Sequence, residues 1–531
     1  MKIVRILSLA ACAAGTFSVC FAQTSVSFAS KASRDAQTPT NLYPVDLNGD
    51  GFDDIVGDTG LSSPGFNVSI NNGDGTFKTP VHYTLTGEPQ NGIGSQPMVT
   101  GDFNNDGKAD VVAVLPDTRL VAFFAGSGTG ALGAGKYSTI ALPSGWYFGG
   151  GGVAAGDLNG DGAEDLVAWA NNSFNPSSST ATALFILVGN RTGGFSSPQR
   201  ILSGPRDMLD FQVFTGDFDA DGKTDVISTE YTLDNSGNPI DARAHVLYGN
   251  NDFTFTPTVA YSEASGILMI GAGDLNSDGY SDFYALNGFD TPQKLDVFYG
   301  QAGRTFRSYF NSMSSTYNAG SDGDTSLRFN SQFVMGDFNG DKRMDLAIFA
   351  YKITSPPQEF MQFWRATSNE GQFTPQVISI SPAYPEESLP VVGLFGGSRL
   401  KPDVLLNHSQ NYGSPPQDQP SYLLAEINQA SSGSFGPCRY PQAEQGFAVC
   451  AAGTASGTSS VFRADVNSFG KLRKIELWVD GKKVVEQHHT WDHHAWFNYS
   501  HAFAAGTHNA SLIAADVDNR LQKHKFTFTV K

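Results

Sequence analysis

Short apolar segments alternate along the chain with polar turns that are rich in glycine, asparagine and aspartate. One nine-residue polar pattern, Asp-x-Asn/Asp-x-Asp-Gly-x-x-Asp, precedes an apolar segment of β-forming residues and recurs about every 60 residues. About 25 to 35 residues after each pattern begins, a second apolar segment leads into a Gly/Asn/Ser-rich turn that usually ends in phenylalanine, as at residues 71–77 and 189–195. Apolar runs bounded by such turns predict β-strands, with four in each period.

The nine-residue pattern occurs six times in register. The copies, numbered loop 1 to loop 6, are residues 46–54, 102–110, 157–165, 217–225, 274–282 and 337–345. A seventh segment, residues 393–404, keeps the flanking glycine and the closing Pro402-Asp403-Val404 but has lost the earlier carboxylates. Seven units of four strands are typical of a β-propeller. We therefore predict an all-β chain with a seven-bladed β-propeller over residues 23–436.

The spacing within each loop predicts a calcium site. Carboxylates or amides at positions 1, 3, 5 and 9, a main-chain carbonyl at position 7 and a glycine bend at position 6 can surround one hard cation with oxygen. Magnesium prefers to keep several waters and zinc prefers softer ligands, so calcium fits best. The alternative is an acidic surface turn without metal. Loop 6 departs from the pattern because Lys342 replaces the glycine at position 6, and the seventh segment is expected to bind no ion.

About six structural Ca²⁺ ions are therefore expected. Their predicted ligands, with position 7 contributing its carbonyl, are Asp46, Asn48, Asp50, Phe52 and Asp54; Asp102, Asn104, Asp106, Lys108 and Asp110; Asp157, Asn159, Asp161, Ala163 and Asp165; Asp217, Asp219, Asp221, Lys223 and Asp225; Asp274, Asn276, Asp278, Tyr280 and Asp282; and Asp337, Asn339, Asp341, Arg343 and Asp345. Six divalent ions would offset about twelve negative charges of a chain whose net charge is −18. Most of the acidity is then explained by metal sites.

These motifs resemble FG-GAP/VCBS repeats, the calcium-loop β-propellers similar to the headpiece of integrin α chains and to many secreted bacterial proteins. The resemblance covers roughly residues 24–435 and implies a propeller with calcium in its loops. It implies much less about function. The chain departs from the pattern at the seventh segment and at Lys342.

The N-terminal residues 1–22 have the pattern of an export signal, with Lys2 and Arg5 before an apolar run and small residues before Gln23. The alternative is a lipobox at residues 9–12, which would make Cys12 a lipidated N-terminus. No later apolar stretch has the length of a membrane span. We therefore expect a secreted or cell-surface protein. In such a compartment Cys438 and Cys450 are expected to form a disulfide, or both are buried thiols.

Residues 437–531 have a different composition and predict a small β-sandwich. Strands are expected at residues 461–466, 474–479, 482–487, 497–503, 511–516 and 525–530, with a hairpin turn at Asp480-Gly481. The segments around this turn and at residues 505–508 resemble bacterial Ig-like domains. The His-rich segment 488–494 is a polar loop or a transition-metal site. Trp491 and Trp496 are an alternative sugar-stacking surface.

The sequence favours binding over catalysis. An acidic chain with pI 4.9 lacks the charge for a nucleic-acid partner, and no motif of hydrolases, zinc proteases, phosphate loops or dinucleotide sites is present. We predict a monomeric binding or adhesion protein that recognises a protein or glycan through the face opposite the loops, where the longer connections and their aromatic residues lie. These connections are residues 170–182, 230–243, 310–331, 351–359 and 407–421, with Tyr231, Tyr317 and Tyr412, and the segment Trp146-Tyr147-Phe148. The alternative is a polysaccharide lyase or hydrolase, and unliganded connections remain a third possibility.

Overall fold

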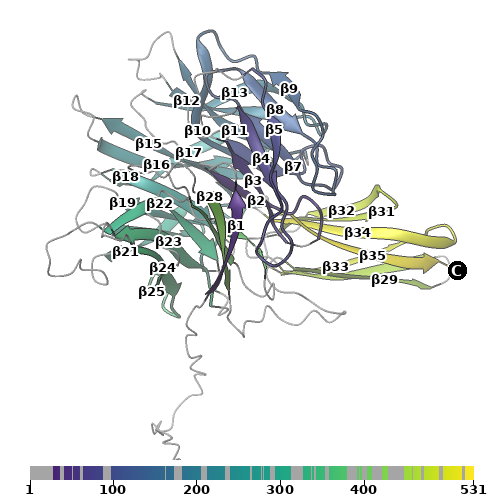
Figure 1. The fold of residues 1–531 in the computed structure, drawn as a ribbon. Helices are drawn as coiled ribbons and strands as arrows, with labels where there is room; N and C mark the ends of the chain where they lie inside the picture. The colour runs from purple at the N-terminus through teal and green to yellow at the C-terminus, as the bar shows by residue number, and fades with distance from the viewer. Residues whose placement is uncertain are drawn as a thin grey trace, which may run out of the picture.

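A computed structural model gives the fold of the chain (Figure 1). The residues that it describes are 28–35, 41–50, 52–59, 64–87, 97–161, 163–172, 182–204, 212–233, 239–263, 266–276, 278, 280–287, 294–312, 327–336, 338–339, 343–352, 358–379, 391–393, 395–396, 403–408, 421–428, 448–456, 459–467, 472–488, 494–516 and 521–530. Every regular element in these ranges is a β-strand. The all-β prediction is confirmed.

Within residues 28–428 the described strands form seven four-stranded antiparallel sheets, here called blades. Blades 1 to 3 are β2 (Leu42–Val45), β3 (Asp54–Asp58), β4 (Gly65–Ser69) and β5 (Val81–Thr84); β6 (Met98–Gly101), β7 (Asp110–Val114), β8 (Leu120–Phe124) and β9 (Lys136–Thr139); and β10 (Trp146–Gly156), β11 (Asp165–Asn172), β12 (Thr182–Gly189) and β13 (Phe195–Gly204). Blades 4 and 5 are β14 (Val213–Gly216), β15 (Asp225–Leu233), β16 (Pro239–Gly249) and β17 (Phe255–Glu263); and β18 (Ile267–Gly273), β19 (Asp282–Asn287), β20 (Lys294–Gln301) and β21 (Thr305–Ser312). Blade 6 is β22 (Leu327–Gly336), β23 (Asp345–Lys352), β24 (Gln358–Ala366) and β25 (Phe373–Ser379), and blade 7 is β26 (Val391–Gly393), β27 (Asp403–His408), β28 (Ser421–Asn428) and β1 (Phe28–Asp35).

The blades follow one another around a closed ring, as Figure 1 shows. The first strand of each blade contacts the first strand of the next, and β2 of blade 1 contacts β26 of blade 7. The strand β1 closes the ring by pairing with β28, from Phe28↔Asn428 to Asp35↔Ser421. The sequence pattern did not predict this pairing, because β1 lies before the first acidic loop and carries no motif.

The core lies between the blades. Separate apolar clusters fill the contacts from blade to blade, including one of Leu42, Ile55, Phe395 and Leu405 between blades 1 and 7. Trp146 and Phe148 belong to such a cluster and are 5% and 0% exposed. The expectation that they face a partner was therefore wrong, because alternate residues of β10 point into the blade contact.

The C-terminal part forms two sheets. One contains β29 (Ala448–Ser456), β30 (Ser459–Asn467) and β33 (His494–His501); the other contains β31 (Leu472–Val479), β32 (Lys482–His488), β34 (Gly506–Asp516) and β35 (Leu521–Val530) in the order β32-β31-β34-β35. Side chains including Phe462, Leu477, Phe497 and Leu512 pack between them. The turn at Asp480-Gly481 has φ values of 50° and 76°, as expected for a two-residue hairpin. Cys438 and the segment 489–493 lie outside the described residues.

Candidate metal centres

The acidic loops connect the first and second strands of each blade and share one pattern of hydrogen bonds. In loops 1 to 5 the N–H of position 5 donates to the side-chain oxygens of position 1 (3.0–3.3 Å) and position 3 (2.8–3.2 Å). The N–H of position 7 donates to the carboxylate of position 5 (2.7–3.0 Å). The backbone thus wraps around the carboxylate and amide oxygens and holds them on one side, as a cation site requires.

Position 4 provides a left-handed bend that the sequence analysis did not identify. Gly49, Asn105, Gly160 and Ala220 have φ values of 70°, 62°, 74° and 57°. Position 6 is also left-handed where it is described, at Gly107 (76°) and Gly222 (84°). Position 4 escaped notice because glycine, asparagine and alanine share no side-chain chemistry, although the first two tolerate this conformation.

Replacing Ala220 with glycine is expected to stabilise the protein. Alanine in the left-handed region costs roughly 1 kcal/mol that glycine avoids, partly offset by the greater freedom of glycine in the unfolded chain. We expect Ala220→Gly to raise the free energy of unfolding by about 0.5 kcal/mol in urea titrations. Ala163→Gly is the matched control, because Ala163 is outside the positive-φ set, and it should be neutral or destabilising. Destabilisation by Ala220→Gly would contradict the prediction.

The aspartate at position 9 joins two parts of its blade. In loops 1 to 5 one carboxylate oxygen accepts the N–H of position 2, and the other accepts an N–H from the end of the third strand or from the turn that follows it. These donors are Leu47 and Asn71 for Asp54, Phe103 and Gly126 for Asp110, Leu158 and Gly189 for Asp165, Phe218 and Gly249 for Asp225, and Leu275 and Gly300 for Asp282, at 2.7–3.1 Å. Position 9 therefore has a structural function even without metal.

The seventh segment keeps the loop half of this arrangement without the other carboxylates. Asp403 is 1% exposed and accepts the N–H groups of Phe395 and Gly396, both at 2.9 Å. This explains why Asp403 is present where positions 1, 3 and 5 have lost their acidic residues. The sequence pattern alone indicated only the remnant of a calcium loop.

Burial raises the pKa of the position-9 carboxyls. The pKa is about 8 for Asp54, Asp110 and Asp225 and about 7 for Asp165, mainly because all four side chains are removed from water. The neighbouring carboxylates of the same loop raise it further, while the backbone N–H donors lower it. The positive charge of a divalent cation would offset both unfavourable effects.

Stability should therefore depend on pH in opposite ways with and without calcium. In the metal-free folded protein these carboxyls hold protons up to about pH 7 to 8, whereas in the unfolded chain they lose them near 3.8. The folded state then binds more protons, so its stability falls as pH rises from about 5 to 8. Calcium binds the deprotonated form, so calcium affinity should rise over the same range. Melting of metal-stripped protein at several pH values checks this; a melting temperature that rises with pH would contradict it.

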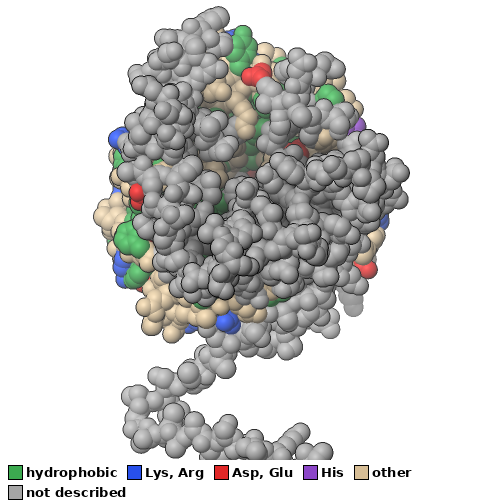
Figure 2. All heavy atoms as spheres, turned by 60° about the vertical axis from the view of Figure 1, so that its left-hand side comes forward, with side chains coloured by type: hydrophobic (Ala, Val, Ile, Leu, Met, Phe, Trp, Pro, Cys, Tyr) green, Lys and Arg blue, Asp and Glu red, His purple; other side chains and the backbone are tan. Residues whose placement is uncertain are grey.

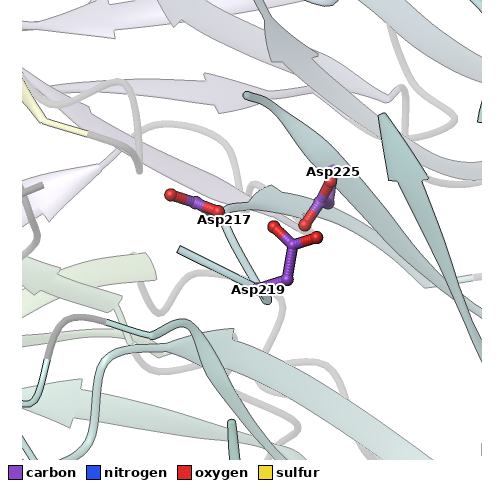
Figure 3. Close-up of side chains that lie close together, drawn as sticks. All are labelled: Asp217, Asp219 and Asp225. Atoms are coloured by element: carbon purple, nitrogen blue, oxygen red, sulfur yellow. The ribbon is translucent and has the colours of Figure 1, made fainter. Parts of the chain in front are cut away.

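Loop 4 brings three carboxylates together. Asp217, Asp219 and Asp225 each place an oxygen within 4.8 Å of the others, and Figure 3 shows the carboxylates of Asp219 and Asp225 turned toward one another. Three carboxylates with no soft donor fit a hard divalent cation. The extra carboxylate of this loop, Asp219, also accepts a hydrogen bond from Nε of Arg304 in blade 5 (2.8 Å). The positive charge of Arg304 balances the negative charge of Asp219.

The loops also contact the following blade. Gly130 N donates to Leu47 O of loop 1 (3.2 Å), and Asn276 Nδ2 of loop 5 donates to Glu370 of blade 6 (3.0 Å). The last contact of this kind closes the ring, where Asn71 Nδ2 donates to Phe395 O (2.9 Å). An ordered loop therefore supports its own blade and the next one.

The structure describes loops 1 to 5 nearly completely and loop 6 in part. Asp337, Asp341 and Lys342 lie outside the described residues, as do Gly51, Gly162 and Gly279. In loop 6, Asn339 is 1% exposed and Asp345 Oδ1 accepts the N–H of Ala366 (2.8 Å), so position 9 again reaches the end of the third strand. Calcium in all six loops remains a prediction.

An FG-GAP-like repeat model matches residues 46–113, 102–168 and 157–228. This part of the chain carries three FG-GAP-like repeats, as the acidic loops predicted. No curated protein is significantly similar in sequence.

Solved propellers resemble the fold at low identity. A Dos1 propeller is 8% identical, covers 77% of this chain and 96% of its own, and has a TM-score of 0.41. An Agrocybe aegerita lectin that recognises non-reducing terminal N-acetylglucosamine is 16% identical, with 64% and 80% covered and a TM-score of 0.41. A Penicillium chrysogenum α-L-arabinanase is 10% identical, with 70% and 92% covered and a TM-score of 0.33.

Proposed function

We propose that the protein is an exported, calcium-stabilised propeller that binds an extracellular glycan or protein through the face opposite its acidic loops. The observation that carries the proposal is the difference in side chains between the two faces of the propeller. The loop face is occupied by carboxylates tied into the backbone and by neighbouring turns, and it suits metal binding. The described connections of the opposite face, such as residues 115–119 between β7 and β8, lack this repeated pattern of carboxylates. Among the described residues no helix has the length and apolar character needed to cross a membrane.

The opposite face displays aromatic side chains in its described part. Tyr147, at the start of β10, is 36% exposed, and Phe310, near the end of β21, is 68% exposed. Figure 2 looks toward the side of the propeller away from the C-terminal sheets, where the described side chains in view are largely apolar or uncharged, with isolated charged groups. Tyr317 and Tyr412 lie outside the described residues. Exposed aromatic rings provide rigid contact area at low entropic cost, which suits recognition.

Tyr147 is part of an ordered platform. Arg119 lies over the tyrosine ring at 5.0 Å and donates hydrogen bonds to Trp146 O and Pro143 O, both at 2.9 Å. Arg119 lies in the connection between β7 and β8. The backbone of this connection also contacts β10, because Phe148 N donates a hydrogen bond to Thr118 O (2.9 Å). A guanidinium that lies over an aromatic ring offers polar donors and an apolar surface at one place. This combination suits the binding of a sugar ring.

Replacing Tyr147 should test this function. On an array of glycans and surface proteins, with calcium present, we expect Tyr147→Ala to lower ligand capture by about tenfold or more, as for a central aromatic contact. Val81→Ala is the control, because Val81 is 54% exposed on the outer strand β5, and it should leave capture unchanged. Unchanged capture by both Tyr147→Ala and Phe310→Ala, with the fold preserved, would refute the proposed surface.

A second candidate function is polysaccharide cleavage, supported by one pair of carboxyl groups. The Tyr261 hydroxyl lies 2.7 Å from Asp296 Oδ2 and 3.1 Å from Glu263 Oε2, at strand ends opposite the acidic loops. Two nearby carboxyls are the usual acid and base, or acid and nucleophile, of glycoside hydrolysis. If the protein is such an enzyme, incubation with a polysaccharide panel yields new reducing ends or unsaturated products, and Asp296→Asn abolishes them. Binding without turnover supports the first proposal instead.

A further inference from the structure

The sheet β32-β31-β34-β35 of the C-terminal part contacts the propeller at loops 1 and 2. Three lysine ammonium groups donate hydrogen bonds there: Lys483 Nζ to Asn105 Oδ1 (2.5 Å), Lys523 Nζ to Gly107 O (3.1 Å) and Lys525 Nζ to Asn48 O (3.5 Å). The two segments are far apart in sequence, and Figure 1 shows the C-terminal strands beside the ring. The contact thus joins basic side chains of one part of the chain to acidic loops of the other.

The contact also has an apolar part that depends on the shape of loop 2. A Cβ atom added to Gly107 would lie 2.7 Å from Ile513 Cδ1 and 2.9 Å from Trp478 Cε2, so these side chains touch the loop backbone. The remaining space, lined by Asp46, Lys523 and Lys525 among others, is about 20 Å³, or roughly one water. The C-terminal sheet therefore fits the loop in the wrapped conformation described above.

The lysines use oxygens that the predicted ions do not. They bond to the carbonyl of position 3, the side chain of position 4 and the carbonyl of position 6. The ions would use side chains at positions 1, 3, 5 and 9 and the carbonyl of position 7. In loop 2, Lys108 pairs with Asp106 (3.1 Å), so one Ca²⁺ would balance the remaining charge. Loop 1 has four aspartates and no basic residue, so with one Ca²⁺ it would keep a net negative charge that attracts the ammonium groups. Without an ion the carboxylates repel one another, which opposes the wrapped conformation.

We propose that the C-terminal sheet docks on loops 1 and 2, and that calcium binding to these loops and docking of the sheet stabilise each other. The coupling arises because both require the same wrapped backbone, and it must be reciprocal. This inference rests on the proposed calcium sites. Among the described contacts, loops 3 to 5 meet other partners, namely Asn251, Arg304 and Glu370 from the neighbouring blades. Loops 1 and 2 are therefore the coupled pair.

Lysine footprinting of the full chain tests the coupling. The rates of acylation of Lys483, Lys523 and Lys525 are measured by mass spectrometry in calcium and after chelation, with bound calcium counted in the same samples. Exposed Lys78 on the propeller serves as the internal reference. We expect chelation to raise the three rates by about fivefold or more, as a docked surface opens, while Lys78 is unchanged.

Matched variants assign the effect to the two loops. In calcium, Asp46→Asn with Asp102→Asn should raise the three acylation rates, whereas Asp157→Asn with Asp274→Asn, in loops 3 and 5, should not. Gly107→Ala places a methyl group against Ile513 and Trp478 and should also raise them. Gly222→Ala is its control, since Gly222 occupies the same position of loop 4 with a similar φ of 84°. It should strain its own loop and leave the lysines protected.

The outcomes separate this inference from the proposed function. If calcium is bound but the three rates are the same with and without it, or fall on chelation, the coupling is wrong and the calcium sites stand. If loops 3 and 5 affect the lysines as strongly as loops 1 and 2, the assignment to this contact is wrong. If the chain binds no calcium, both proposals fail.

Discussion

Chelation of calcium is expected to lower the melting temperature of the protein by about 10 °C or more. Each ion bound at a hundredfold excess over its dissociation constant stabilises the folded state by about 2.7 kcal/mol, and several loops contribute. The loss should be large because each loop supports its own blade and contacts the next, as at Leu47 with Gly130 and at Asn276 with Glu370. Calorimetry in calcium and in chelator, followed by return of calcium, measures the effect.

Magnesium is the matched control for this experiment. Replacing calcium with an equal concentration of Mg²⁺ should recover only a small part of the stability, because Mg²⁺ gives up its waters reluctantly and demands octahedral geometry. Melting curves that are the same in calcium, magnesium and chelator would contradict a structural role for the loops as calcium sites.

Asp110→Ala is expected to destabilise the protein by about 3 to 6 kcal/mol. The substitution removes the acceptor for the N–H groups of Phe103, Asn104 and Gly126, at 3.0, 3.2 and 2.8 Å. Each buried donor left without an acceptor costs about 1 to 3 kcal/mol. In calcium the loss should be greater still, because the variant also loses a ligand of loop 2. Urea titrations in calcium and in chelator give both values.

Asp403→Ala separates the structural function of position 9 from metal binding. Asp403 accepts two N–H groups in a segment that has no other acidic ligand. Its replacement should cost about 2 to 4 kcal/mol, and the cost should be the same in calcium and in chelator. If Asp110→Ala shows no greater loss in calcium than in chelator, position 9 of loop 2 is not a calcium ligand.

The sequence predicted the strands and the loops well because both depend on local patterns. The spacing of Asp46, Asn48 and Asp50 determines which oxygens meet, and the structure brings them together through bonds between neighbouring residues. The hairpin at Asp480-Gly481 was likewise predictable, because two residues in a left-handed conformation need specific residue types.

Other features depend on contacts between distant segments, and no local pattern marks them. Nothing near β1 indicates that it pairs with β28. Lys523 contacts Gly107 although the two residues are more than 400 positions apart in the sequence, and no sequence motif indicates this contact. The expectation that Trp146 faces a partner was wrong for the same reason, since only the neighbouring blade shows which side of β10 is covered.

The most direct test of the account is a count of the ions bound to the chain. After equilibration with millimolar Ca²⁺ and removal of free metal, elemental analysis and native mass spectrometry should find about six calcium ions per chain. Asp161→Ala should lower the count by one. A chain that retains no calcium under these conditions would contradict the central claim that the repeated acidic loops are metal sites that stabilise the propeller.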